Sequence, residues 1–315
     1  MTVRYAVLMK VHYWDDFAER RLQHLLRKVR SGAVYVFVDE TRSAVGQIAH
    51  NHVIRATERD IERLKIVLHP RGDLFWYNVD YPLYLSYLEN NSYDYYLMCE
   101  HDAVINIDVD EFIEIAERDR VDYVGSPSPE DFSSWYWRGT CDGVYPQSFT
   151  LYNWINCISL HSRRSVEFLL ERRQSLALRF EAGEIRNWPF SEAFIPTEMQ
   201  NNGFVVRKLS DFGKAEKYAW WPPILEIDLP MLQDQAFLHP VLDEPRYVTS
   251  CVRQSRLQSY FSRDSHLRQL LNRVSPLSAI TALLKEFMHR FWPWFKSKVS
   301  KRSPLQRQFP YKKNT

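Results

Sequence analysis

The chain has 315 residues, of which 45% are hydrophobic and 25% charged, and its net charge is +2. This length and composition allow a large buried core, and they exclude collagen-like and disordered chains. Only nine glycines are present, which argues against glycine-rich phosphate loops and flexible linkers. The balanced charge gives no reason to expect a nucleic-acid partner, and we expect none.

The cysteines and the N-terminal segment bear on the compartment. No C-x-x-C pair occurs, so we expect buried, reduced thiols and neither a disulfide framework nor a zinc site, for Cys99, Cys141, Cys157 and Cys251. The apolar run at residues 6–9 is interrupted by Lys10 and is too short for a signal peptide. No stretch reaches the roughly 18 apolar residues of a transmembrane helix. These features predict a cytoplasmic protein.

Strand-like and helix-like segments alternate through the first 130 residues. We predict strands at 5–9, 33–38, 93–99 and 121–125, and helices at 15–30, 55–64, 81–88 and 108–118. This order predicts an α/β fold with a mostly parallel central sheet flanked by helices. Ligands bind at the carboxyl ends of the strands in such sheets, so the polar residues that follow the strands are candidates for a site.

The second half is aromatic and irregular at first and then regular again. After an irregular segment at 131–152, we predict a strand at 153–160, a helix at 163–178, a helix within 188–203 and a strand at 204–209. The composition shifts after Tyr247. We therefore expect a domain at 1–247, with halves 1–130 and 131–247, and a tail at 248–315.

Two acids separated by one residue follow the apolar strand that ends at Cys99. They belong to the triplet Glu100-His101-Asp102. Carboxylates are the ligands that Mg²⁺ and Mn²⁺ prefer beside substrate phosphates, so the triplet is a candidate metal site. A second triplet, Asp108-Val109-Asp110, precedes an apolar helical pattern, and we interpret it as a helix start with Asp108 as the N-cap.

This order of features resembles the GT-A superfamily of glycosyltransferases over about residues 3 to 242. In that superfamily the first half binds a nucleotide-sugar, an acid ending the second strand contacts the nucleotide, and a D-x-D triplet ends a later strand. The resemblance implies that Asp39 contacts the nucleotide, and we expect Lys10 and Glu40, which also follow strands, to bind the nucleotide as well. It also implies that Glu100-His101-Asp102 replaces D-x-D, with Asp102 the more direct ligand of Mn²⁺ or Mg²⁺.

Three residues of the second half complete the expected site. In similar enzymes a late histidine joins the metal site, and His239 has that position. An inverting transferase needs a general base to take the acceptor's proton, and an acid at a helix start serves this purpose in similar enzymes. Glu192 matches that place and Glu198 is the reserve. If the enzyme instead retains configuration, Glu192 would position the acceptor.

Aromatic residues in loop-like segments are candidates for binding an acceptor sugar, because aromatic rings stack on sugar rings. We expect such a groove to use Trp135, Trp137, Trp220 and Trp221.

The last residues combine basic and aromatic side chains, and no acid follows Glu286. We predict an amphipathic helix at 279–288, interrupted by Pro293. Its interleaved aromatics include Phe291, Trp292, Trp294 and Phe295, and its basic residues are Arg290, Lys296, Lys298, Lys301, Arg302, Arg307, Lys312 and Lys313. This pattern is typical of a segment in the membrane interface, so we expect a peripheral position on the inner face of an anionic membrane. A disordered basic tail is the alternative.

The leading hypothesis is a metal-dependent glycosyltransferase that moves a sugar from a nucleotide-sugar to a saccharide or lipid-linked glycan, in cell-surface polysaccharide biosynthesis. A nucleotidyltransferase of similar α/β fold is one alternative. Those enzymes carry a glycine-rich loop after the first strand, whereas this chain has Met9 to Trp14 without glycine. A non-catalytic carbohydrate-binding or membrane scaffold protein is the other alternative, and it predicts no metal-dependent nucleotide binding.

Overall fold

The computed structural model of the chain describes residues 3–68 and 74–300, the last ten of these by their backbone alone. The chain divides into two compact units, Met1–Val241 and Leu242–Thr315. Each unit is considered by itself below.

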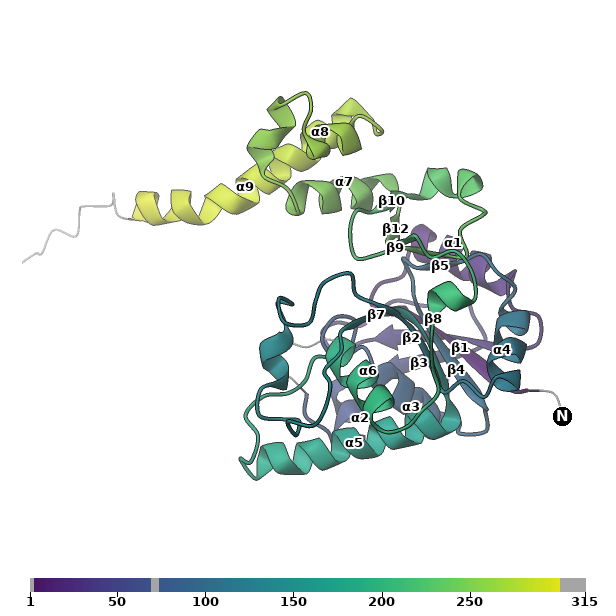
Figure 1. Cartoon of the computed structure of the whole chain (residues 1–315). Coiled ribbons are helices and arrows are strands. Elements are labelled where there is room, and N and C mark those ends of the chain that lie inside the picture. The colour runs from purple at the N-terminus through teal and green to yellow at the C-terminus, as the bar shows by residue number, and fades with distance from the viewer. Residues whose placement is uncertain (1–2, 69–73, 301–315) are drawn as a thin grey trace, which may run out of the picture. The chain divides into compact units, whose positions relative to one another are not determined.

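A seven-stranded mixed sheet forms the centre of the first unit, with the strand order β3-β2-β1-β4-β7-β6-β8 (Figure 1). Strands β3, β2, β1 and β4 run parallel, β7 runs antiparallel to both of its neighbours, and β6 and β8 are parallel. The α/β class with a mostly parallel sheet is confirmed. The strands are β1 (Tyr5–Val11), β2 (Ala33–Asp39), β3 (Val53–Ala56), β4 (Tyr95–Glu100), β6 (Tyr123–Pro127), β7 (Trp154–Ser162) and β8 (Val206–Lys208).

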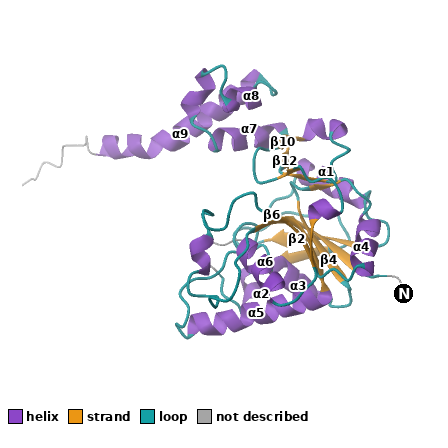
Figure 2. Cartoon of the chain, viewed as in Figure 1, coloured by secondary structure: helices purple, strands orange, loops and turns teal. Residues whose placement is uncertain are grey.

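Helices cover both faces of this sheet (Figure 2). Successive side chains of β1 point to opposite faces, so Val7 and Met9 join one buried cluster while Ala6 and Leu8 join the other. The first cluster includes residues of α1 (Asp16–Leu26) and α4 (Val109–Arg118). The second includes residues of α2 (Glu58–Arg63), α3 (Tyr81–Glu89), α5 (Arg163–Glu181) and α6 (Ser191–Asn201).

The start of α4 has the capping arrangement that its sequence predicts. Asp108 is the N-cap, and its Oδ1 accepts a hydrogen bond from the Glu111 amide at 3.1 Å. Asp110 accepts hydrogen bonds from the amides of Arg30 and Ser31, at 2.7 and 3.0 Å. Both acids of this triplet therefore hold backbone in place, and the interpretation of Asp108 as a cap is confirmed.

One predicted helix was wrong at its beginning. Residues 55–64 were expected to be helical, but Val53–Ala56 form β3 beside β2, and the helix α2 begins at Glu58 after Thr57. The β-branched Val53 and Ile54 favour a pleated strand, and tertiary pairing with β2 extends that preference through Arg55. Consequently Glu100 ends the fourth strand along the chain and not the third.

A small second sheet is formed by short strands from the middle and the end of the first unit. β5 (Val104–Ile105), β9 (Lys217–Tyr218) and β11 (Phe237–His239) form a three-stranded sheet, with β11 antiparallel to β5. The amide of Val241 donates to the carbonyl of Asp102 at 2.7 Å. This pairing holds the segment that contains His239 against the segment that follows β4. The other short elements are β10 (Ile224–Leu225), β12 (Val241–Leu242), η1 (Arg138–Cys141), η2 (Leu209–Asp211) and η3 (Glu226–Met231).

The second unit is helical, with α7 (Glu244–Arg253), η4 (Leu257–Phe261), α8 (His266–Leu271) and α9 (Pro276–Ser300). Arg290 of α9 donates to the carbonyls of Val252 and Arg253, at 3.3 and 2.9 Å. The expected interruption at Pro293 is not observed, because α9 continues to Ser300. Several of the expected residues lie outside what the structure describes: the side chains of Phe291, Trp292, Trp294, Phe295, Lys296 and Lys298, and all of Lys301, Arg302, Arg307, Lys312 and Lys313. Within the described helices, none is both long and apolar enough to cross a bilayer.

Candidate functional site

The site lies at the carboxyl ends of β1 and β4. From β1 the chain continues to β2 and β3 on one side, whereas β4 lies on the other side of β1. Such a reversal of strand order creates a crevice outside the strand ends, where α/β proteins bind ligands. Lys10 and Glu100 are register partners here, and the Lys10 Nζ lies 3.1 Å from the Glu100 Oε1. The Lys10 side chain is fully buried, so it compensates Glu100 and does not extend into solvent.

The structure brings together the three residues expected to bind a metal. The Nε2 of His239 lies 3.9 Å from Glu100 Oε2 and 3.7 Å from Asp102 Oδ1. His239 Nδ1 lies 2.8 Å from the carbonyl oxygen of Ala219. Because a carbonyl only accepts hydrogen bonds, Nδ1 carries a hydrogen, and the lone pair of the neutral ring is on Nε2, facing the two acids.

The spacing of the His239, Glu100 and Asp102 atoms is closer to that of ligands around a divalent cation than to that of a hydrogen bond. Separations of 3.7 and 3.9 Å are too long for hydrogen bonds. Nitrogen and oxygen ligands lie about 2.0–2.2 Å from an ion such as zinc, so two ligands of one ion are about 3.0–3.5 Å apart. The Oδ1 of Asp102 is buried without a hydrogen-bond partner among the described residues. The backbone carbonyl behind His239 supplies the support that metal-bound histidines use.

Glu192 approaches the same group of charges from the start of α6. Its carboxylate accepts a hydrogen bond from the Asn156 amide of β7. Burial, followed by the charge of Glu100, raises the pKa of Glu192 to about 8. Of the two acids expected as a base, Glu192 is therefore the one that the structure brings to the other site residues.

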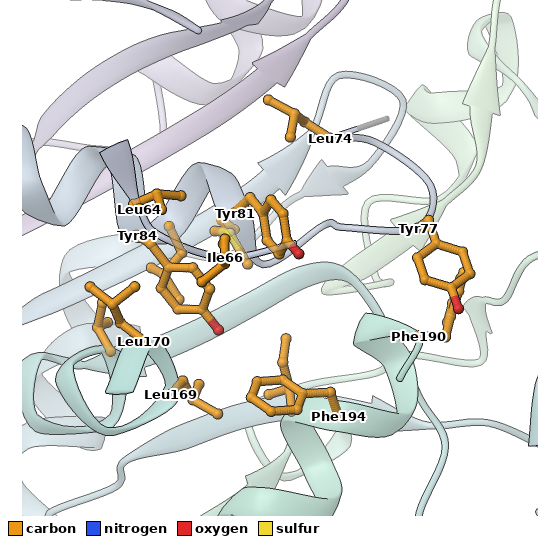
Figure 3. Close-up of a cluster of buried hydrophobic side chains, with 14 of the residues drawn as sticks. Leu64, Ile66, Leu74, Tyr77, Tyr81, Tyr84, Leu169, Leu170, Phe190 and Phe194 are labelled. Atoms are coloured by element: carbon orange, nitrogen blue, oxygen red, sulfur yellow. The ribbon is translucent and has the colours of Figure 1, made fainter. Parts of the chain in front are cut away.

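A buried polar network fixes the beginning of α6. Arg173 of α5 donates to the Asp80 carboxylate at 2.7 and 3.3 Å, and both side chains are fully buried. The Ser191 hydroxyl has two acceptors within hydrogen-bond distance, the Asp80 carboxylate and the Tyr77 carbonyl, the latter at 2.7 Å. Rings of α3 and α6 belong to the same buried cluster. Figure 3 shows Tyr84 beside Leu170 of α5, and Phe190 beside Tyr77. Glu192 follows Ser191 directly, so the network orients it.

Glu198 has different surroundings on the same helix. It is fully buried, and Arg172 donates to its two oxygens at 3.1 and 3.3 Å. Asn202 donates to it at 3.1 Å. Burial raises the pKa of Glu198, and the charge of Arg172 opposes that effect. These contacts make Glu198 a structural ion-pair partner.

The two acids at the end of β2 are already engaged by the protein. Asp39 accepts hydrogen bonds from the amides of Thr41 and Leu74, at 2.9 and 3.1 Å. Glu40 accepts from the Val45 amide at 2.8 Å and from Arg55 at 2.6 Å. The structure places both at the same edge of the sheet as Lys10, but without a contact to the Glu100 group among the interactions of the described residues.

The four tryptophans expected to bind sugar do not form one surface. Trp135 is only 6% exposed and packs in the core, so it has no free face for a ring. Trp137 stacks on Phe190, with centroids 5.2 Å apart. Trp220 is 53% exposed in the loop after β9, beside the half-buried Trp221. Trp76, which was not among the expected residues, is half exposed and packs edge-on against Trp137 with ring centroids 4.9 Å apart.

Two further residues belong to the surroundings of the site. His101, the middle of the triplet, is buried among rings, where the Tyr13 hydroxyl lies 2.6 Å from its Nε2. Burial lowers the pKa of His101. Cys157 of β7 has its Sγ within 4.8 Å of ligand atoms of Glu100 and His239. No local pattern in the sequence indicates this position, because only the pairing of β7 with β4 brings Cys157 there.

Comparison with known proteins adds nothing to these observations about the function of the chain. No protein-family model matches the chain, and no curated protein matches its sequence.

Proposed function

We propose that the chain is a metal-dependent glycosyltransferase of the GT-A type. It would transfer a sugar from a nucleotide-sugar to a saccharide or lipid-linked glycan, in the synthesis of a cell-surface polysaccharide. The observation that supports this most is the convergence of Glu100, Asp102, His239 and Glu192 at the strand ends where the order of the sheet reverses. Metal ligands and a general base are the two components that this reaction requires.

Asp102, His239 and Glu100 are the residues that would hold the metal. A bound Mn²⁺ or Mg²⁺ supplies positive charge for the diphosphate leaving group. Lys10 keeps Glu100 oriented by its ion pair of 3.1 Å. The Ala219 carbonyl keeps the free ring nitrogen of His239 directed at the acids. Both contacts hold a ligand side chain in a fixed orientation, and such preorganised groups favour catalysis because they need little rearrangement.

Glu192 has the chemistry of the base. As the acceptor hydroxyl oxygen forms its bond to the anomeric carbon, the hydroxyl proton passes to the Glu192 carboxylate. The bond from the anomeric carbon to the diphosphate oxygen breaks at the same time. A base works best when its pKa is near the operating pH, and the pKa of about 8 for Glu192 is in that range. The Asn156 amide and the buried network below Ser191 hold it in place.

The acceptor is expected to lie along the exposed rings beside α6. Trp76 is 49% exposed and Tyr136 82% exposed, and both pack edge-on against Trp137. Trp137 in turn stacks on Phe190, two residues before Glu192. Exposed aromatic faces bind sugar rings, and this position favours Trp76 and Trp137 over Trp135 as acceptor contacts.

The second unit is proposed to bind an anionic membrane surface. The exposed apolar residues of α9 recur at helical spacing, as Leu277, Ile280, Leu284 and Met288. Their spacing of three or four residues places them on one side of the helix. The many basic residues that follow in the sequence add attraction to anionic lipid, at about 1 kcal/mol each.

The test is turnover of a panel of nucleotide-sugars by the full chain, with Mn²⁺ or with a chelator, measured as release of the nucleoside diphosphate. The proposal expects release from one donor class that depends on metal and rises when a suitable glycan acceptor is added. Absence of turnover with every donor, on protein shown to be folded, would contradict the transferase and favour a binding or scaffold protein.

A further inference from the structure

Cys157 is positioned at the metal site by the pairing of two strands. In the antiparallel pair of β4 and β7, Cys99 lies opposite Ile158. One step further along, Glu100 and Cys157 follow on their respective strands. The ligand atoms of Glu100, Cys157 and His239 all lie within 4.8 Å of one another.

The other three cysteines have different surroundings. Cys99 points into the core, with its Sγ 3.8 Å from the Ala103 carbonyl. Cys141 is buried in the cluster around α5 and α6, and Cys251 is buried in α7. Cys157 is the only one of the four whose residue is partly exposed, whereas Cys99, Cys141 and Cys251 are buried.

We propose that Cys157 is a third type of ligand in the metal site, beside the carboxylate of Glu100 and the imidazole of His239, and that the site therefore prefers Zn²⁺ and Co²⁺ to Mg²⁺. This revises the expectation that the four cysteines are buried, reduced thiols without a zinc site, because Cys157 is partly exposed. The inference rests on the metal site of the proposed function but not on the transfer reaction.

The ligand types and distances support this preference. Thiolate and imidazole suit zinc and cobalt, whereas Mg²⁺ prefers six oxygen ligands. Zinc–sulfur bonds are about 2.3 Å and zinc–nitrogen bonds about 2.0–2.1 Å, so two ligands of one tetrahedral ion lie about 3.3–3.6 Å apart. The ligand atoms of the three side chains lie within 4.8 Å of one another, so side-chain movements of up to about 1.5 Å would bring them onto one ion. On binding, a bond forms between Sγ and the ion, and the thiol proton leaves to solvent.

The test uses Co²⁺ as the probe, because a cobalt–thiolate bond gives a near-ultraviolet charge-transfer absorption that oxygen and nitrogen ligands do not give. The full chain is titrated with CoCl₂ alone, alongside Cys157→Ser and the control Cys251→Ala. We expect the absorption in the wild type and the control and its loss in Cys157→Ser. Loss of an outer-shell partner already weakens metal binding by about 10–100-fold, so we expect Zn²⁺ affinity to fall at least about tenfold in Cys157→Ser.

A second measurement covers a variant that fails to fold. Wild-type protein is alkylated with iodoacetamide, with and without ZnCl₂, and the labelled cysteines are identified by mass spectrometry. The inference expects Zn²⁺ to protect Cys157. Co²⁺ binding without the thiolate absorption, or alkylation of Cys157 that saturating Zn²⁺ leaves unchanged, would overturn it. Nucleotide binding with Mn²⁺ in that case would leave the transferase proposal standing, whereas a cobalt–thiolate absorption without nucleotide binding would support the thiol site alone.

Discussion

The ammonium group of Lys10 and the carboxylate of Glu100 form a 3.1 Å ion pair between the neighbouring parallel strands β1 and β4. Because the Lys10 side chain is fully buried, a cation from solvent cannot take the place of its ammonium group beside Glu100. Asp102 adds a second carboxylate to the surroundings, and Lys10 offsets only part of this negative charge. A divalent cation would neutralise this excess of negative charge, and the neighbouring imidazole of His239 would be a further ligand.

Glu192 and Glu198 should respond differently to the same substitution. We expect Glu192→Gln to lower kcat by about 10²–10⁴-fold, the usual contribution of a general base, with little change in the free energy of unfolding. We expect Glu198→Gln to destabilise the fold by about 1–3 kcal/mol because it leaves Arg172 without a charged partner. Steady-state kinetics and urea unfolding of both variants check this. Equal loss of kcat in the two variants would speak against Glu192 as the base.

The buried pair of Arg173 and Asp80 should be a major source of stability around α6. Asp80→Asn leaves a buried guanidinium without its counter-charge, so we expect a loss of about 3–5 kcal/mol. The exposed pair of Arg207 and Asp211 is the control, and Asp211→Asn should cost less than about 1 kcal/mol. Urea unfolding measures both. A loss for Asp80→Asn no larger than for the control would show that the network does not hold α6.

His161 should make the fold sensitive to acid. Its ring is fully buried, and burial lowers its pKa from 6.5 to about 3. The pKa is lowered in the folded state only. The contribution of the neutral His161 ring to the free energy of unfolding is therefore complete above about pH 6.5 and is lost as the pH falls toward about 3. Between about pH 7 and pH 5 the stability should fall by about 2 kcal/mol through this group.

The variant His161→Gln removes this titration, so its unfolding free energy should change less between the two pH values than that of the wild type. The variant His289→Gln, which removes an exposed imidazole, provides the comparison. The same pH dependence in the wild type and in His161→Gln would assign the acid sensitivity to other groups.

The apolar stripe of α9 should decide membrane binding. We expect Leu284→Asp to weaken binding to phosphatidylglycerol vesicles at least about tenfold, because burial of one leucine contributes about 1.5–3 kcal/mol. The variant His289→Asp adds the same charge to α9 outside the stripe and should have a smaller effect. Vesicle sedimentation measures both, and phosphatidylcholine vesicles test the need for anionic lipid. Equal binding by the wild type and Leu284→Asp would contradict the interface proposal.

The alternating segments were sufficient to predict the class of the fold. Strands expected at 5–9, 33–38 and 93–99 are present as β1, β2 and β4, because continuous apolar runs bounded by polar residues have few other solutions. The direction of β7 was not predictable from its own residues, since periodicity does not report which way a strand pairs. The short strand β3 depends on its neighbour β2 and was taken for helix.

The candidate site was predictable only where its residues follow strands or begin helices. Glu100 and Asp102 follow β4, and Glu192 is in the first turn of α6, so local pattern singled them out. The nearness of Cys157 to Glu100 depends on register between distant strands, and the burial of Trp135 depends on packing around Phe190. Neither leaves a local signal.

The central claim is a metal-dependent nucleotide site at Asp102. Calorimetric titration of UDP, GDP and CMP, with and without Mn²⁺, tests it on the wild type, Asp102→Ala and the control Asp234→Ala, whose exposed carboxylate pairs only with the surface residue Lys214 among the ion pairs of the described residues. We expect one nucleotide to bind with Mn²⁺, binding to be lost in Asp102→Ala, and binding to persist in Asp234→Ala. Absence of binding by all three nucleotides to folded wild-type protein with Mn²⁺ present, or unchanged binding in Asp102→Ala, would contradict it.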